Sequence, residues 1–300
     1  MNRRNVFKST VLAFAGASTA ATSEKKPGNV PFVTTVDGVS LFYRDWGTGP
    51  PVVFLAPWGL HSDWWEYQMA HLADQGLRCV ACDRRGHGHS SEPVRGYDFD
   101  TLAGDLNTVM ERLDLRGVTL VGHSMGSGEV VRYLARHGAG RVARIVLVAP
   151  ITPFVLKTAD NPDGADPASL EAVRKVLSQD RPTGIAGAAS GFFGEPKNPV
   201  STEMKQWWIN MLMDCSLKVL IELHHAFTET DFRPDLRAIA VPTLIVHGDS
   251  DTSTRLELTG RKTANLIRGS QLKVYEGAAH ALPITHRDKL NADLLAFIKS

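Results

Sequence analysis

Short apolar runs rich in valine, isoleucine and leucine alternate along the chain with segments whose apolar residues recur at helical spacing. The strand-like runs are residues 32–38, 39–46, 51–56, 77–83, 118–123, 144–149, 242–248 and 271–277. The first two flank a turn at Asp37 and Gly38 and predict a hairpin. The later runs are apolar throughout, which is typical of parallel strands buried on both faces. The pattern therefore predicts a mostly parallel sheet flanked by helices.

The helical segments lie between these runs and at the C-terminal end. They are residues 64–76, 98–113, 125–138, 256–267 and 284–300. One stretch, residues 151–232, breaks the alternation, because it has no strand-like run and contains a polar turn sequence, DNPDGADP, and the aromatic segments FFGEP and QWWINMLM. We expect this stretch to be a helical cap, inserted into a single α/β domain that spans residues 32–300.

The N-terminus has a different character. Residues 1–21 combine a basic head, an apolar stretch and small residues suited to cleavage, which is the pattern of a secretory signal peptide. The paired Arg3 and Arg4, followed by Lys8, are typical of twin-arginine export, with an ordinary export signal or a chance basic N-terminus as the alternatives. We predict a periplasmic or secreted protein. The apolar stretch is too short for a membrane span, and residues 22–31 form a polar linker. We expect no membrane association after cleavage.

Composition argues against nucleic-acid binding and against a disulfide or metal site built on the cysteines. The 33 basic and 32 acidic side chains nearly cancel, so the chain has no basic surplus for binding nucleic acid. The three cysteines are Cys79, Cys82 and Cys215, an odd number. Cys79 and Cys82 point to opposite faces of one strand, which is poor geometry for a disulfide, and a metal site would need further ligands. We expect all three to be small core residues.

The candidate chemistry begins where the run 118–123 leads directly into SMGSG and a helical segment. Gly122, Ser124 and Gly126 form a G-x-S-x-G motif, in which a sharp strand-to-helix turn makes the serine hydroxyl project. A serine hydroxyl is a weak nucleophile unless an imidazole takes its proton and a carboxylate orients that imidazole. Ser124 therefore predicts a base and an acid elsewhere in the chain.

Candidate partners follow the last two strand-like runs, in loops at the carboxyl ends of strands, where α/β sheets place functional groups. Asp249 and Asp251 follow the seventh run, and His280 follows the eighth. The order serine, aspartate, histidine is that of hydrolases with this type of nucleophile turn. Either aspartate fits the acid, and His286 is an alternative base.

These motifs resemble those of the bacterial aryl esterases and cofactor-free haloperoxidase-like hydrolases of the α/β-hydrolase superfamily. The resemblance covers residues 30–300 and rests on DRRGHGHSS, VTLVGHSMGSGEVVRYLARHG, FTETDFRPDL, PTLIVHGDSD and GAAH. It implies the α/β-hydrolase fold and chemistry without a metal or organic cofactor. It also implies Ser124 as the nucleophile, His280 as the base and Asp251 as the acid, with Asp249 as a turn residue.

The resemblance further implies an oxyanion hole, in which the backbone amides of Trp58 and Met125 bind the negative charge of the tetrahedral intermediate. Pro57 precedes Trp58 where the family has glycine, so the loop must follow a different backbone route, of which a cis bond before Pro57 is one. Gly59 replaces a proline of peracid-forming relatives, so perhydrolysis should be secondary. After Asp251 the sequence TSTR replaces the family's apolar residue and proline.

Together these expectations predict a serine hydrolase that cleaves carboxylic esters through an acyl-enzyme intermediate. Aromatic side chains near the cap favour small, apolar aryl or short-chain alkyl esters as substrates. They are Trp58, Trp64, Trp65, Phe154, Phe192, Phe193, Trp207 and Trp208. We expect only Trp58 and one or two of the cap aromatics to contact substrate, and most of the others to be core residues. The alternatives are a cofactor-free haloperoxidase or perhydrolase, a lactonase, and a non-catalytic ligand-binding protein on a hydrolase scaffold. No sequence pattern predicts an oligomeric state.

Overall fold

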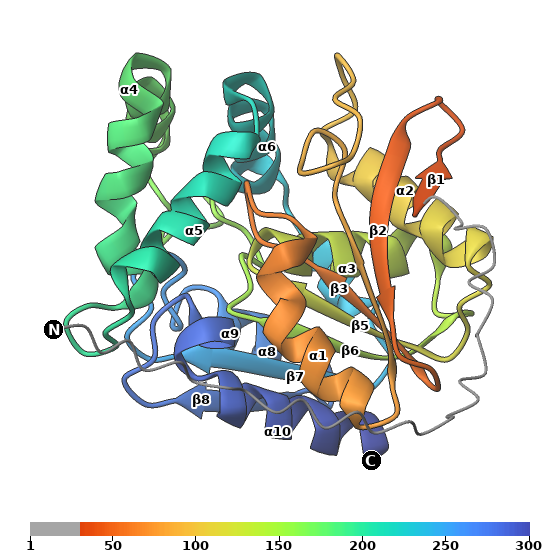
Figure 1. Cartoon of the computed structure of the whole chain (residues 1–300). Coiled ribbons are helices and arrows are strands. Elements are labelled where there is room, and N and C mark those ends of the chain that lie inside the picture. Colours follow the sequence, from red (N-terminus) through yellow and green to blue (C-terminus); the bar gives the residue numbers. More distant parts are fainter. Residues whose placement is uncertain (1–30) are drawn as a thin grey trace, which may run out of the picture. The chain divides into compact units, whose positions relative to one another are not determined.

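The computed structural model describes residues 31–300, whose strands form one eight-stranded sheet (Figure 1). The strands are β1 (Phe32–Thr34), β2 (Ser40–Trp46), β3 (Pro51–Leu55), β4 (Arg78–Cys82), β5 (Val118–His123), β6 (Val142–Val148), β7 (Thr243–Gly248) and β8 (Gln271–Tyr275). Their order in the sheet is β1-β2-β4-β3-β5-β6-β7-β8. β2 is antiparallel to both of its neighbours, and the remaining pairs are parallel. The predicted hairpin and mostly parallel sheet are therefore confirmed.

The N-terminal predictions concern residues that the structure does not describe. The signal peptide of residues 1–21 and all but the last residue of the linker lie outside the described residues, so export stays a prediction. Among residues 31–300, no helix has the length and apolar character that crossing a lipid bilayer requires.

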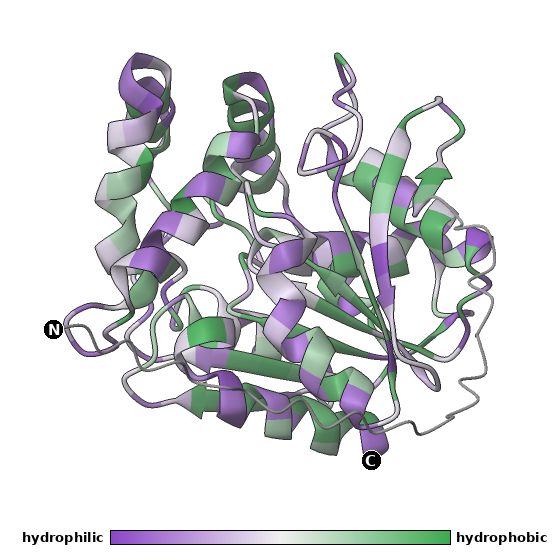
Figure 2. Cartoon of the chain, viewed as in Figure 1, coloured by the Kyte–Doolittle hydropathy of each residue, from purple (hydrophilic) through white to green (hydrophobic). Residues whose placement is uncertain are grey.

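The inner strands are buried on both faces because their sequences are apolar at nearly every position. Every residue of β5 and β7 is buried, and the centre of the sheet is correspondingly hydrophobic in Figure 2. The helices that cover the sheet are α1 (Glu66–Asp74), α2 (Phe99–Arg112), α3 (Met125–His137), α8 (Gly260–Leu266), α9 (Leu282–Thr285) and α10 (Arg287–Lys299). α2 packs against α3, whereas α1 packs against α9 and α10.

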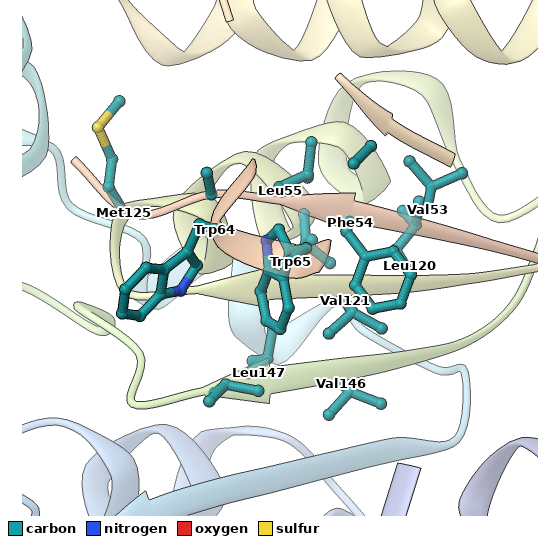
Figure 3. Close-up of a cluster of buried hydrophobic side chains, with 14 of the residues drawn as sticks. Val53, Phe54, Leu55, Trp64, Trp65, Leu120, Val121, Met125, Val146 and Leu147 are labelled. Atoms are coloured by element: carbon teal, nitrogen blue, oxygen red, sulfur yellow. The ribbon is translucent and has the colours of Figure 1, made fainter. Parts of the chain in front are cut away.

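Two adjacent tryptophans from a short 3-10 turn, η1 (Ser62–Trp65), fill the space beside the central strands (Figure 3). Trp64 and Trp65 are fully buried, and the ring of Trp65 lies 5.1 Å from that of Phe54 on β3. Trp64 donates a hydrogen bond from Nε1 to His123 Nδ1 at 3.0 Å. Both tryptophans thus belong to the core.

The predicted cap is present between β6 and β7. It consists of α4 (Pro167–Phe193), α5 (Thr202–Asp214) and α6 (Leu217–Glu229), and α7 (Arg233–Arg237) then leads back to the sheet. Asp166, Ser201 and Ser216 cap the three longer helices by accepting hydrogen bonds from backbone amides in the first turn. α4 is kinked at Asp180, two residues before Pro182, because proline cannot continue the helical hydrogen-bond ladder.

Candidate active site

Ser124 lies where β5 turns into α3, in a strained backbone conformation with φ 52° and ψ −116°. The chain can cross so closely here only because its neighbours are glycines. A Cβ at Gly122 would lie 2.4 Å from the carbonyl oxygen of Gly126, and a Cβ at Gly126 would lie 2.4 Å from that of Leu55. The amide of Ser124 donates to the carbonyl of Val148 at 2.9 Å, which ties the turn to β6.

His280 lies in the loop after β8, and its Nδ1 is 2.7 Å from Asp251 Oδ2. Because an ionised carboxylate only accepts hydrogen bonds, Nδ1 carries a proton and the neutral ring keeps Nε2 as an acceptor. Ser124 and His280 line the same cavity. The structure thus brings Ser124, Asp251 and His280 together in one site.

The other predicted candidates lie elsewhere. Asp249 is exposed, and its Oδ1 accepts hydrogen bonds from the amide of Gly277 at 2.8 Å and from Ser250 Oγ at 3.1 Å. It therefore connects the loops that follow β7 and β8. His286 precedes α10, packs near the ring of Tyr275, and does not line the cavity.

Asp251 is buried and surrounded by hydrogen-bond donors. Its Oδ1 accepts from the amides of Ser253 and Thr254 at 2.8 and 2.9 Å, and its Oδ2 also accepts from Thr254 Oγ1 at 3.0 Å. His247 Nε2 lies 3.4 Å from the same Oδ2. Burial alone would raise the pKa of Asp251, but His280, through its charge when protonated and its hydrogen bond from Nδ1, and the nearby His247 hold that pKa well below its usual range.

Sequence reasoning did not identify Thr254 or His247 as parts of this site. His247 is the fifth residue of β7 and is fully buried, and its Nε2 donates to the carbonyl of Thr254 at 2.6 Å. A usable signal was its position four residues before Asp251, because a histidine near the carboxyl end of β7 lies close to the start of the loop that carries Asp251. For Thr254 the signal was the departure TSTR, in which hydroxyl side chains stand where the family has apolar ones.

The loop after β3 forms a tight turn. The amide of Leu60 donates to the carbonyl of Pro57 at 3.3 Å, and Gly59 at the third position has φ 71°, as a type II turn requires. Proline, whose φ is fixed near −65°, cannot adopt this conformation, so the turn differs from that of relatives with proline at this position. The bond before Pro57 is trans, so a cis bond is not the route by which the loop accommodates this proline.

Two backbone amides near the Ser124 turn lack a hydrogen-bond acceptor in the part of the chain that the structure describes. Within residues 31–300, the amides of Trp58 and Met125 donate to no protein acceptor. Residues of α6 in the cap hold the indole of Trp58. Its Nε1 donates to the carbonyl of Leu220 at 2.9 Å, and its ring lies 6.2 Å from that of Phe227. The cap therefore holds the loop that carries one of these amides.

A buried ion pair connects the same loop to the helix that follows Ser124. Arg84 donates from Nε to Glu129 Oε1 on α3 at 2.9 Å and from Nη2 to the carbonyl of Ala56 at 2.8 Å. Arg84 and Glu129 are both buried, so solvent screens their attraction little. The pair thus fixes the spacing between Ala56 and α3, and hence between the two free amides.

A cavity of about 240 Å³ separates Ser124 from the cap. The cap side contributes Ile151, Val173, Leu177, Gly184, Ile185, Ala188, Phe192, Trp208, Leu212 and Phe227, and the opposite side contributes Pro57, Trp58, Ser124, Ser253, Thr254 and His280. No carboxylate, lysine or arginine is among these lining residues. The aromatic lining consists of Trp58, as expected, and three cap residues, of which Phe227 was not anticipated.

A family model for the alpha/beta hydrolase fold matches residues 50–287 of this chain. The chain belongs to the α/β-hydrolase family. It is 44% identical over 273 residues to a non-heme chloroperoxidase of Kitasatospora aureofaciens, covering 90% of this chain and 99% of the relative. It is 39% identical over 275 residues to a bifunctional esterase/perhydrolase of Acinetobacter calcoaceticus, with the same coverage of both chains.

Solved structures agree with this assignment. An esterase from Exiguobacterium antarcticum matches with a TM-score of 0.86 and 33% identity, covering 90% of this chain and 99% of that one. The protein is therefore an α/β-hydrolase enzyme, with its predicted fold and inserted cap confirmed.

In this α/β hydrolase, we predict that Gly126→Ala destabilises the fold by roughly 1–3 kcal/mol, because the new Cβ forces α3 away from the backbone of Leu55. Gly104→Ala on α2 is the matched control, since its added Cβ meets no atom beyond the adjoining backbone of its own helix, and it should stabilise by roughly 0.5–1 kcal/mol. Urea unfolding midpoints measure both effects. Equal midpoints for the two variants would contradict the close crossing.

Proposed function

We propose that this hydrolase cleaves apolar carboxylic esters by covalent catalysis at Ser124. The observation that carries the proposal is the placement of His280, which is hydrogen-bonded to Asp251 and lines the cavity into which the strained turn presents Ser124. A nucleophile, a base and an acid in this order are the groups that ester hydrolysis through an acyl-enzyme requires.

The proposed reaction has two halves. Ser124 Oγ attacks the ester carbonyl while His280 Nε2 takes its proton, and Asp251 stabilises the resulting imidazolium through Nδ1. The tetrahedral intermediate collapses, and His280 donates the proton to the departing alkoxide. Water then attacks the acyl-enzyme with His280 again as the base. The acid product leaves, and the Ser124 hydroxyl is restored.

The free amides of Trp58 and Met125 are the proposed oxyanion hole. Each would donate a hydrogen bond to the carbonyl oxygen as negative charge develops on it. Their neighbours support this role, because Arg84 and α6 hold the Trp58 loop in place before substrate binds. Donors fixed in this way need no rearrangement during the reaction, and the apolar cavity strengthens their effect.

Perhydrolysis is the second candidate function, and the relatives named as chloroperoxidase and esterase/perhydrolase favour it. The same acyl-enzyme would react with hydrogen peroxide in place of water. Gly59 supports hydrolysis as the main reaction, because its φ of 71° gives the loop a different turn from that of relatives with proline there.

The remaining alternatives are a lactonase and a non-catalytic binding protein. A lactone is an internal ester and would undergo the same chemistry. A non-catalytic binding role would leave the strain at Ser124 and the buried Asp251 charge without a function.

We predict that Ser124→Ala lowers kcat for an aryl acetate by several orders of magnitude and abolishes labelling by a fluorophosphonate probe, because both need the activated hydroxyl. Ser190→Ala is the control, since Ser190 is exposed on α4. Circular dichroism should show that both variants are folded. Persistent labelling of folded Ser124→Ala would reject the proposed nucleophile.

A comparison of two aspartates tests the proposed acid. Asp251→Asn should lower kcat roughly 10³–10⁴-fold, because an amide at this position favours the wrong imidazole tautomer. Asp249→Asn keeps an oxygen that can accept from the amide of Gly277, so its kcat should change less than about threefold. Steady-state kinetics on the same ester decide the matter, and the opposite ranking would assign the acid to Asp249.

The lining of the cavity predicts substrate preference. Uncharged aryl or short-chain esters should have kcat/KM at least about tenfold higher than esters of equal size that carry a carboxylate, because no lining cation pairs with that charge. A matched series of neutral and carboxylated phenyl esters provides the measurement. Equal values across the series would show that substrate does not enter this cavity.

A further inference from the structure

Thr254 contacts both members of the buried aspartate and histidine pair. Its Oγ1 lies 3.0 Å from Asp251 Oδ2 and 3.2 Å from His280 Nδ1, while those two atoms are 2.7 Å apart. The three atoms therefore form a nearly equilateral triangle. Thr254 is itself buried and lines the cavity.

The geometry indicates which way each proton points. The N–H bond of His280 lies along the shortest side of the triangle, toward Asp251 Oδ2, so it cannot also point at Thr254 Oγ1. The carboxylate is charged and accepts strongly, so the hydroxyl of Thr254 donates to the same oxygen. Its other acceptor, the carbonyl of Ala149, is more distant at 3.3 Å.

The backbone fixes this hydroxyl in place. The amide of Thr254 donates to Asp251 Oδ1 at 2.9 Å, and its carbonyl accepts from His247 Nε2 at 2.6 Å. Both ends of the residue are thus held against the carboxylate. These contacts fix the backbone at position 254 and so place the start of its side chain beside Asp251.

We propose that Thr254 is a fourth, positioning member of the triad, whose hydroxyl donates to Asp251 Oδ2 and takes up part of the negative charge that stabilises protonated His280. The inference rests on the proposed roles of Asp251 and His280. Thr254 touches neither the nucleophile nor the reacting atoms, and it acts only through the carboxylate. Removing its hydroxyl should concentrate the negative charge on the bond to His280 and make that imidazole more basic.

Other titratable groups face this pair and bear on the test. His247 at the end of β7 lies 3.4 Å from Asp251 Oδ2, and the ring of His123 at the end of β5 lies 4.8 Å from that of His280. Burial and the neighbouring His280 hold the pKa of His123 well below its usual range, so His123 stays neutral near neutral pH. Neither contact involves the hydroxyl of Thr254, so a change there leaves both in place.

The experiment compares the pH dependence of kcat/KM for the wild type and three variants, Thr254→Val, Thr254→Ser and Thr252→Val. The last variant is a control in the same loop. Valine matches the shape of threonine without its hydroxyl, and serine restores the hydroxyl. Thr252 is exposed and is not among the residues that line the cavity of Ser124. We expect the acid limb of Thr254→Val to move upward by about half a pH unit, and those of Thr254→Ser and Thr252→Val to match the wild type.

An unshifted limb in folded Thr254→Val would overturn the proposal, and a downward shift would show that the hydroxyl accepts from His280 instead. Thr254→Ala gives the same test should the valine variant not fold. Proton NMR supplies a readout without turnover, since the Nδ1 proton of His280 should move downfield in Thr254→Val as its bond to Asp251 strengthens. A wild type without esterase activity would reject the proposed function, whereas an unmoved resonance would reject the role of Thr254.

Discussion

Between β5 and α3 the chain reverses at Ser124, and the backbones that cross there leave no room for a side chain at Gly122 or Gly126. The strained serine costs of the order of 1–3 kcal/mol, which the buried strand and helix on either side offset. This crossing brings the start of α3 against Leu55 and Ala56 at the end of β3, so Met125 lies close to the loop that carries Trp58. The serine turn thus determines the position of the proposed nucleophile and of both proposed oxyanion donors.

The charged groups around this crossing are buried, and each is paired with an opposite charge or with hydrogen-bond donors. Arg84 and Glu129 neutralise one another, and Asp251 accepts from two amides, a hydroxyl and an imidazole. A buried charge that lost its partner would cost several kcal/mol, so these networks define one arrangement of the loops more sharply than apolar packing does. The apolar cavity supports the adjacent network of charged groups, because an apolar lining excludes water that would weaken the attraction between those charges.

The sheet, the covering helices and the cap could be predicted from the sequence because each has a strong periodicity or a clear break in it. Ser124, Asp251 and His280 could be named because they follow strand ends in a recognisable order. The turn at Pro57 could not be derived, since its trans route depends on the φ of Gly59 and on the hydrogen bond from Arg84. Thr254 and His247 were missed because their contacts with Asp251 arise only when the loop folds back on β7.

The cap covers the candidate site and also holds in place the loop that carries Trp58. α6 accepts a hydrogen bond from the indole of Trp58 through the carbonyl of Leu220 and packs His224 and Phe227 against the same ring. Burial, and to a lesser extent Arg174, lowers the pKa of His224 to about 4, so this histidine is neutral near neutral pH and packs as an uncharged ring. A movement of α6 would therefore move the loop that carries the Trp58 amide. α4 is tied to the same helix, because Arg174 Nη1 donates to His224 Nδ1 at 3.1 Å, so a movement of either helix would disturb the proposed oxyanion hole.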